Sequence, residues 1–296
     1  MTTTATTATS GMPAPFTYLG GKIRLAPKIV SLLPPHRIYI EPFFGSGAVL
    51  FAKAPAPVEI VNDANGDLVT FFRVLRDRPA DLERACALSP HARDEFNHAK
   101  ATTDESGDEV ERARRFWVRV NQSFAKTAHR TTGWSISSAR NQSIPASIRT
   151  RLGRFADCAE RLARVSIDNT DATTVIERHA SPDTVIYADP PYLGTTRNLR
   201  GRHGDYAVDM PKPAEHEHLA HALNTTSARV VLSGYPSPLY DHLYRGWNRI
   251  EIPTRVHTGN ATAGTTRQAR TEVLWTNYDP PHHHHHHQLT LDENHL

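Results

Sequence analysis

The chain has 296 residues, of which 22% are charged, and its formal net charge is +3 at pH 7. This length suits one large α/β domain with a modest insertion, and no apolar run reaches the ~18 residues that a membrane-spanning helix needs. Cys86 and Cys158 lack metal or redox spacing and suit a reducing compartment, so we expect a cytoplasmic protein without a secretion signal.

The first part of the chain predicts a disordered tail and then a loop that can hold an anion. Residues 1–15 are rich in threonine and alanine, which is typical of a disordered terminus. The sequence YLGGK at residues 18–22 precedes an amphipathic helix over residues 25–33. A Gly-Gly-Lys turn suits a carboxylate or a phosphate.

Residues 37–54 predict a strand, a glycine-containing turn and a helix. The turn contains Gly45 and Gly47, and glycines at such a place let the backbone approach a ligand beside a helix N-terminus. The third glycine of the dinucleotide-binding fingerprint is missing. The turn therefore predicts a ligand loop of another class.

A second short strand, over residues 58–63, ends in the acid Asp63. An acid at the tip of the second strand of a doubly wound sheet commonly binds ribose hydroxyls, at an interval of ~20 residues from the glycine turn. Asp63 follows Gly45 by 18 residues, which is close to that interval. The alternative is that Asp63 caps the helix predicted over residues 65–75.

The middle of the chain is basic and interrupts the rhythm of strands and helices. Ten lysine or arginine residues and no acid lie between residues 112 and 154, and the remainder of the chain has a net charge of −7. Residues 121–134 are polar and turn-rich, with Phe124 and Trp134 interleaved. Such a block favours contact with a polyanion such as DNA, and the alternative is a solvated basic helix face.

The sheet is predicted to resume at residues 165–167, 185–187 and 230–233, with a closing pair of strands at 249–256 and 272–277. The buried run before residue 189 ends in Asp189, Pro190, Pro191 and Tyr192. The Asp189 carboxylate and backbone carbonyl can accept hydrogen bonds from an amino group, the prolines stiffen the backbone, and the Tyr192 ring can stack on a flat heterocycle. This arrangement suits activation of an exocyclic amine. The alternative is an ordinary Pro-Pro loop.

Four motifs together resemble a known family: YLGGK at 18–22, EPFFGSG at 41–47, NDAN at 62–65 and DPPY at 189–192. Their order is that of the Dam-type DNA adenine-N6 methyltransferases, which use S-adenosylmethionine. The resemblance covers most of residues 16–278 except the middle. It implies an α/β fold with a Rossmann-like S-adenosylmethionine-dependent methyltransferase sheet and an inserted, mainly helical and loop-rich DNA-recognition subdomain.

The resemblance also implies roles for single residues around the cofactor, S-adenosyl-L-methionine. Tyr18 and Lys22 would lie near its methionine end. The floor of the site would comprise Glu41, Phe43, Gly45 and Gly47. Asp63 would bind the ribose, and Asp171, with Asp168 as its competitor, would contact the adenine amino group.

For catalysis, the resemblance implies that Asp189 faces both the methionine amino group and the target amine. Pro190 and Pro191 would hold it in place, and Tyr192 would stack on the flipped base. The basic middle and the loop after the catalytic motif would contact DNA through Lys126, His129, Arg130, Trp134, Arg140, Arg197 and Arg200.

The resemblance divides the chain into a catalytic domain in two parts around the insertion. We expect the first part of the catalytic domain at 16–90, a DNA target-recognition subdomain at 91–155 and the second part at 156–280, between tails at 1–15 and 281–296. The last tail contains six consecutive histidines, which are either an affinity tag or native. We interpret residues 215–218 (EHEH) as a helix start with exposed polar side chains rather than a metal site.

The implied activity is site-specific methylation of N6 of an adenine flipped out of duplex DNA, without a metal. Cytosine-N4 methylation, methylation of a protein glutamine and a non-catalytic DNA-binding module that kept the fold are the alternatives. The stretch after Asn121 differs from the Dam-type recognition hairpin, so no recognition sequence is implied. Expected partners are duplex DNA and, in the cell, a restriction endonuclease, with a monomer as the default.

Overall fold

A seven-stranded sheet runs through the protein in the order β3-β2-β1-β4-β5-β7-β6. The computed structural model describes residues 11–102, 107–124, 126, 132–136, 143–193, 209–255 and 269–281. The strands are β1 (Ile38–Glu41), β2 (Val58–Asn62), β3 (Val165–Asp168), β4 (Thr184–Ala188), β5 (Arg229–Gly234), β6 (Asn248–Arg255) and β7 (Ala269–Thr276).

The order of the strands creates a switch point between β1 and β4. β1 pairs in parallel with β2 on one side and with β4 on the other, so that Ile40 lies opposite both Ile60 and Ile186. β3 and β5 extend the parallel part, whereas β7 is antiparallel to both β5 and β6. Ligands of open α/β sheets bind at the carboxyl ends of the strands beside such a point. The predicted Rossmann-like sheet and its closing strand pair are confirmed.

Side chains of successive sheet residues enter two separate cores, because they point to opposite faces of a strand. Tyr39, Val185 and Val231 pack in one core, and Ile40 and Ile186 pack in the other. Helices on the first face are α1 (Ala26–Leu32), α2 (Ala48–Ala52), α3 (Gly66–Asp77), α6 (Glu109–Gln122) and α8 (Phe155–Leu162), and those on the second face are α9 (Ala172–His179), α10 (Pro213–Thr225) and α11 (Pro238–Leu243).

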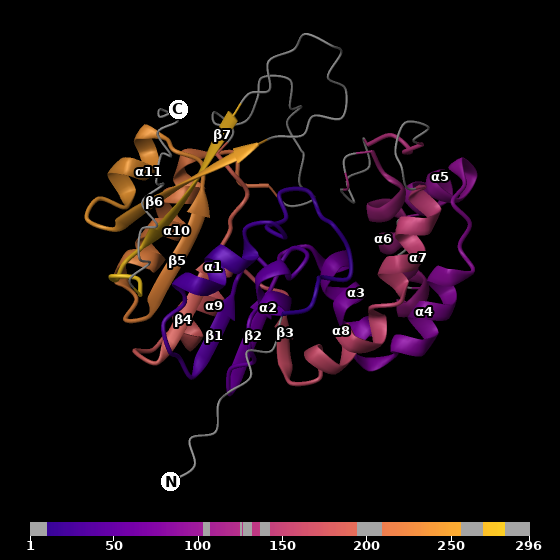
Figure 1. Cartoon of the computed structure of the whole chain (residues 1–296), viewed down its shortest axis with the longest axis horizontal. Coiled ribbons are helices and arrows are strands. Elements are labelled where there is room, and N and C mark those ends of the chain that lie inside the picture. The colour runs from indigo at the N-terminus through magenta and orange to yellow at the C-terminus, as the bar shows by residue number, and fades with distance from the viewer. Residues whose placement is uncertain are drawn as a thin grey trace, which may run out of the picture.

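The helical insertion lies at the end of the molecule that is far from β6 and β7 (Figure 1). It includes α5 (Arg93–Ala101) and α7 (Ile144–Leu152) together with α6. α4 (Pro79–Ala87) precedes the predicted boundary at residue 91 but packs against α6 and α7. The division into subdomains therefore stays a prediction, and α4 packs with the helices of the insertion although it precedes residue 91. Among the described residues, no helix is long and apolar enough to cross a membrane.

The predicted disordered tail is too long, because its last residues belong to the folded domain. The Met12 N–H donates to the Phe51 carbonyl, and Ala14 is buried. The Ala14 carbonyl also accepts a hydrogen bond from Arg154 of the segment between α7 and α8. Composition alone missed this contact, because Ala14 is buried by helices that lie far along the chain.

Candidate active site

A cavity of about 320 Å³ opens at the carboxyl ends of β1, β2 and β4, beside the switch point. Its volume suits a ligand of nucleoside size. All residues assigned to the cofactor by resemblance except Gly47 line it, namely Tyr18, Lys22, Glu41, Phe43, Gly45, Asp63, Asp171 and Asp189. Gly47 itself is the N-cap of α2 and lies just behind this lining.

The glycine turn after β1 needs left-handed backbone at two positions. Gly45 has φ 51° and Gly47 has φ 70°, a region that glycine adopts without steric cost. A Cβ on Gly47 would lie 2.6 Å from Cζ of Phe44. The turn therefore depends on both glycines, and it brings backbone N–H groups to the cavity wall.

Asp63 fixes this turn from the tip of β2. Its carboxylate accepts hydrogen bonds of 2.9 Å from the Gly45 N–H and of 2.9 Å from the Asn65 N–H. Burial raises the pKa of Asp63, and the two N–H groups oppose this effect. The cap of α3 is Asn65, which accepts from Asp67 and Leu68, so the alternative reading of Asp63 as the helix cap is wrong.

Asp171, rather than Asp168, lies at the cavity. Asp171 caps α9 and accepts hydrogen bonds from the Thr173 N–H at 2.8 Å and from the Thr173 hydroxyl at 2.5 Å. The Thr173 hydroxyl bond is the main reason why the pKa of Asp171 is lowered. Asp168 instead lies 3.9 Å from Arg178 and is not among the described lining residues.

Glu41, at the end of β1, is a buried acid in the cavity wall. It is 2% exposed and accepts a hydrogen bond of 2.9 Å from the Tyr39 hydroxyl. Burial raises the pKa of Glu41 to about 8, which the nearby Asp189 charge reinforces. The side chain is thus ready to ionise when a cationic group enters the cavity.

Lys22 lies in a buried cluster of charged groups with Asp189. Its ammonium is 2.9 Å from the Asp189 carboxylate, 3.2 Å from the Glu272 carboxylate and 3.0 Å from the Gly20 carbonyl. Burial opposes its charge, yet the two carboxylates raise the pKa of Lys22 above its ordinary value. Burial likewise raises the pKa of Asp189, and Lys22 counteracts this effect.

Tyr192 lies outside the cavity wall, although Asp189, Pro190 and Pro191 line it. The Tyr192 ring is 7% exposed and packs at a centroid distance of 4.3 Å from the Tyr235 ring. Its hydroxyl accepts a hydrogen bond of 2.5 Å from Lys22 and donates to Glu272. The stacking role of Tyr192 stays a prediction, whereas its polar contacts show a second role within the cluster.

Residues 215–218 lie at the start of α10, as predicted, and Glu217 and His218 are exposed, but His216 is not. His216 is fully buried, with its ring nitrogens 2.9 Å from the Tyr240 hydroxyl and 2.8 Å from the Met210 carbonyl. Glu215 and His218 line the cavity, and His218 lies 3.4 Å from the Thr173 hydroxyl. The sequence pattern of residues 215–218 did not reveal this arrangement, because it depends on the packing of the start of α10 against the cavity. No group of metal-binding side chains occurs among the described residues.

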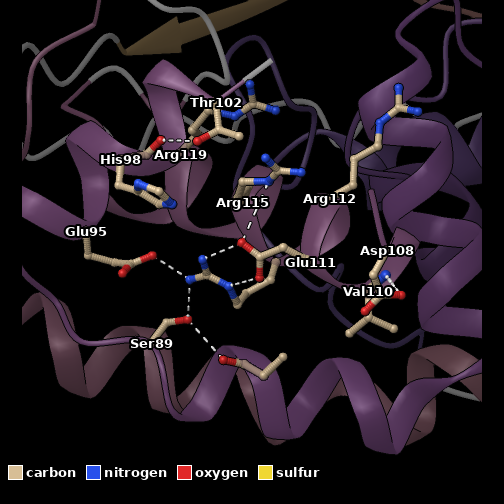
Figure 2. Close-up of polar contacts among 12 residues, drawn as sticks. Ser89, Glu95, His98, Thr102, Asp108, Val110, Glu111, Arg112, Arg115 and Arg119 are labelled. Carbon is tan, nitrogen blue, oxygen red and sulfur yellow. Dashed lines mark hydrogen bonds and ion pairs between the residues drawn. The ribbon is translucent and has the colours of Figure 1, made fainter. Parts of the chain in front are cut away.

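The arginines of α6 form ion pairs within the protein. Figure 2 shows Ser89, Glu95 and Glu111 converging, and all three bind Arg114 at distances between 2.5 and 2.8 Å. Other ion pairs of this helix join Arg112 and Arg119 to Asp67, and Arg115 to Glu111. These four arginines are thus paired within the protein, and the contact of the basic block with a polyanion stays a prediction.

Two of the residues predicted to bind DNA lie in described parts of the chain. The Lys126 ammonium donates to the Asn121 carbonyl at 2.9 Å, and the Lys126 carbonyl accepts from the Leu19 N–H at the cavity. Trp134 forms an isolated antiparallel bridge with Ser123, and the Arg93 guanidinium lies 4.9 Å from its ring. The other five residues lie outside the described residues: His129, Arg130, Arg140, Arg197 and Arg200.

The chain is similar to known proteins over most of its length. Residues 18–258 match the family described as D12 class N6 adenine-specific DNA methyltransferase. The chain is 28% identical to the Type II methyltransferase M1.LlaDCHI of Lactococcus lactis subsp. cremoris, over 89% of this chain and 95% of the relative. It is 27% identical to the Retron Ec67 DNA adenine methylase of Escherichia coli (89% and 93%) and 24% identical to a DNA adenine methylase of Vibrio cholerae (77% and 83%).

Proposed function

Because the chain belongs to the D12 class N6 adenine-specific DNA methyltransferases, we propose that its cavity binds S-adenosylmethionine and that Asp189 orients the adenine amine for methylation. The observation that carries this proposal is the position of the Asp189 carboxylate at the carboxyl end of β4, in the same cavity as the glycine turn and Asp63. Open α/β sheets bind their ligands at this place.

The chemistry of the cavity wall fits S-adenosylmethionine. The acids in the cavity wall include Glu41, Asp63, Asp171 and Asp189, which suits a cationic amino acid end, a ribose diol and an adenine amino group. The Ser46 hydroxyl is buried in the wall and has no hydrogen-bond partner among the described residues. A Cβ on Gly21 would lie 2.9 Å from the Tyr18 carbonyl, so the backbone there leaves space only for glycine.

We assign Glu41 and Asp189 to the methionine ammonium, Asp63 to the ribose and Asp171 to the adenine of the cofactor. When bound, S-adenosylmethionine supplies a methyl group on a sulfonium. Each Asp63 oxygen accepts one backbone N–H, which fixes the carboxylate, and the remaining lone pairs of these oxygens suit ribose hydroxyls. Asp171 is held in the same way by Thr173.

Asp189 accepts an N–H of the target amine, and a backbone carbonyl of the motif accepts the other. This pair of acceptors favours a pyramidal nitrogen whose lone pair points at the electrophile. Proximity and orientation supply most of the rate, so Asp189 does not act as a strong base. The methylated ammonium then loses its proton to solvent. The adenine must leave the DNA stack, at a cost of a few kcal/mol, because its amine is otherwise out of reach.

The segment between α6 and α7 is the proposed DNA-recognition element, within a subdomain at residues 91–155. Its two described ends are joined by the Phe124 N–H to the Gly133 carbonyl and by the Ser135 N–H to the Gln122 carbonyl. Phe124 is 65% exposed beside this connection and Ile136 is 72% exposed. Exposed apolar side chains beside a basic segment suit contact with bases and sugars.

The relative named a Type II methyltransferase supports a restriction endonuclease as a partner in the cell. Resistance of methylated DNA to an endonuclease encoded beside this protein tests this partner. Two unbridged cysteines and a DNA substrate support a cytoplasmic location. A monomer remains the default, and sedimentation of the protein with and without DNA tests it.

The decisive experiment is mass spectrometry of nucleosides from unmethylated duplex DNA incubated with the protein and S-adenosylmethionine. The proposal expects N6-methyladenine with the wild type and none with Asp189→Ala, while the variant retains its DNA affinity. N4-methylcytosine would change the target base and keep the mechanism. Activity of Asp189→Ala equal to the wild type would refute the role of Asp189.

A further inference from the structure

Glu272 of β7 joins the catalytic cluster although it lies 80 residues beyond Tyr192. Its side chain is 5% exposed. One carboxylate oxygen accepts from the Tyr192 hydroxyl and, at 3.2 Å, from the Ser233 hydroxyl. The same oxygen lies 3.2 Å from the Lys22 ammonium. Glu272 thus contacts two residues of the motifs that mark the family, from the antiparallel edge of the sheet.

Two carboxylates, Asp189 and Glu272, lie beside the Lys22 ammonium, one more than a single ion pair needs. Lys22 already has a partner in Asp189, at 2.9 Å, and both side chains are largely buried. A second buried carboxylate beside the same ammonium disfavours ionisation of Asp189 and costs stability unless it is well paired. A purely structural ion pair would be complete with Lys22 and Asp189 alone.

The surplus carboxylate has a use once Asp189 engages an amine. An amine N–H competes with Lys22 for the lone pairs of Asp189. Because Lys22 is buried, its positive charge then needs another anionic partner. Glu272 lies within reach, and the Tyr192 hydroxyl lies between the two as a further donor and acceptor.

We propose that Glu272 is a positioning residue that retains Lys22 and Tyr192 when Asp189 turns its acceptors to the target amine. The inference rests on the proposed role of Asp189. Glu272 does not contact the substrate. It fixes the Tyr192 hydroxyl, and through it the orientation of the Tyr192 ring against Tyr235.

Glu272→Gln tests the role, because glutamine keeps the size of the side chain and an oxygen for the Tyr192 hydroxyl but removes the charge. We expect kcat for adenine methylation to fall by roughly 100-fold, as a small misplacement of reacting groups causes. The dissociation constants for S-adenosylmethionine and for DNA should stay within about threefold. Glu272→Asp should recover part of the lost rate, since it restores the charge.

The pH profile of kcat separates this role from a structural one. Removal of the Glu272 charge favours ionised Asp189, so the acidic limb of the profile should move to lower pH in Glu272→Gln. A residue that only stabilises the sheet would lower the melting temperature without this movement. Glu251→Gln is the matched control, because Glu251 lies on the neighbouring strand β6 opposite Val273 and is exposed.

The outcomes distinguish this inference from the proposed function. A wild type that forms no N6-methyladenine refutes the function itself. An active wild type whose kcat and pH profile are matched by folded Glu272→Gln refutes the positioning role alone. If Glu272→Gln does not fold, Tyr192→Phe keeps the aromatic ring and removes the hydroxyl that links Lys22 to Glu272, and it should lower kcat in the same direction. Unchanged kcat in folded Tyr192→Phe would then count against the role.

Discussion

The Lys22 ammonium lies 2.9 Å from the Asp189 carboxylate, and this ion pair connects the loop before α1 with the carboxyl end of β4. This contact joins two motifs that are far apart in sequence, and one of its partners is the carboxylate that is proposed to orient the target amine. The pair also sets the charge of Asp189, because burial raises the pKa of this acid and Lys22 opposes the rise.

Replacement of Lys22 by methionine should therefore shift the pH dependence of methylation. Without the ammonium, burial and the Glu272 charge raise the pKa of Asp189 further, and only the smaller effect of the Ser233 hydroxyl opposes them. The ionised fraction of Asp189 then falls at neutral pH, so kcat should drop at pH 7 and recover as the pH rises. The measurement is kcat between pH 6 and 9 for both proteins, and a uniform loss at every pH would contradict the explanation.

Glu41 should couple cofactor binding to proton release. Its pKa in the free protein is about 8 because of burial, so Glu41 is mostly protonated at pH 7. A cationic methionine end favours the ionised form, hence affinity for S-adenosylmethionine should rise with pH up to about 8 and a proton should leave on binding below that pH. Calorimetry in two buffers of different ionisation enthalpy measures this proton, and Glu41→Gln should abolish it.

The stability of the free protein should show the opposite sign at Glu41. Its pKa in the folded state, about 8, exceeds the ordinary 4.5, so the folded state binds the proton more tightly than the unfolded state. This contribution to the free energy of unfolding is complete below pH 4.5 and is lost as the pH rises through 8. Glu41→Gln should therefore melt at a higher temperature than the wild type at pH 8.5, and at a similar temperature at pH 5.

The catalytic motif and the cofactor loop were predictable from sequence because their function depends on local backbone. Gly45 and Gly47 need positive φ, and Asp189 follows a buried strand, both of which leave a mark in consecutive residues. Glu272 was not predictable as a site residue. Its contact with Lys22 arises from the antiparallel pairing of β7 with β5, which sequence order does not reveal. The available signal was an acid directly before the buried run Val273–Trp275.

The charge count over the basic middle of the chain did not reveal the ion pairs of α6, for a related reason. A charge count along the sequence includes only near neighbours, whereas Asp67 of α3 and Glu95 of α5 reach α6 through helix packing. These acids lie before the basic block in sequence and beside it in space. Through ion pairs with Asp67, arginines of α6 therefore connect the helical insertion to α3, which covers one face of the sheet.

Arg114→Ala should lower stability and leave DNA affinity nearly unchanged. The Arg114 side chain is 13% exposed and binds Glu95 and Glu111, so its loss removes an ion pair from each acid and leaves Glu111 with Arg115 at 3.7 Å. The expected cost is about 2 kcal/mol in the free energy of unfolding. Urea unfolding measures this cost, with Arg73→Ala as the control, since Arg73 is 48% exposed and pairs only at 3.4 Å with Glu109. A tenfold loss of DNA affinity would instead place Arg114 at the DNA.

Gly47→Ala should impair cofactor binding, whereas Gly246→Ala should not. Both glycines have positive φ, at 70° and 91°, so alanine strains either backbone by about 1–2 kcal/mol. At Gly246 nothing lies within 4 Å of the new methyl group, but at Gly47 it would lie 2.6 Å from the Phe44 ring. Relief of that contact must move Phe44, which lines the cavity, or the turn that holds Gly45 against Asp63. Calorimetry with S-adenosylmethionine should show at least tenfold weaker binding for Gly47→Ala alone, and equal affinities would mean that the turn adapts without moving the site.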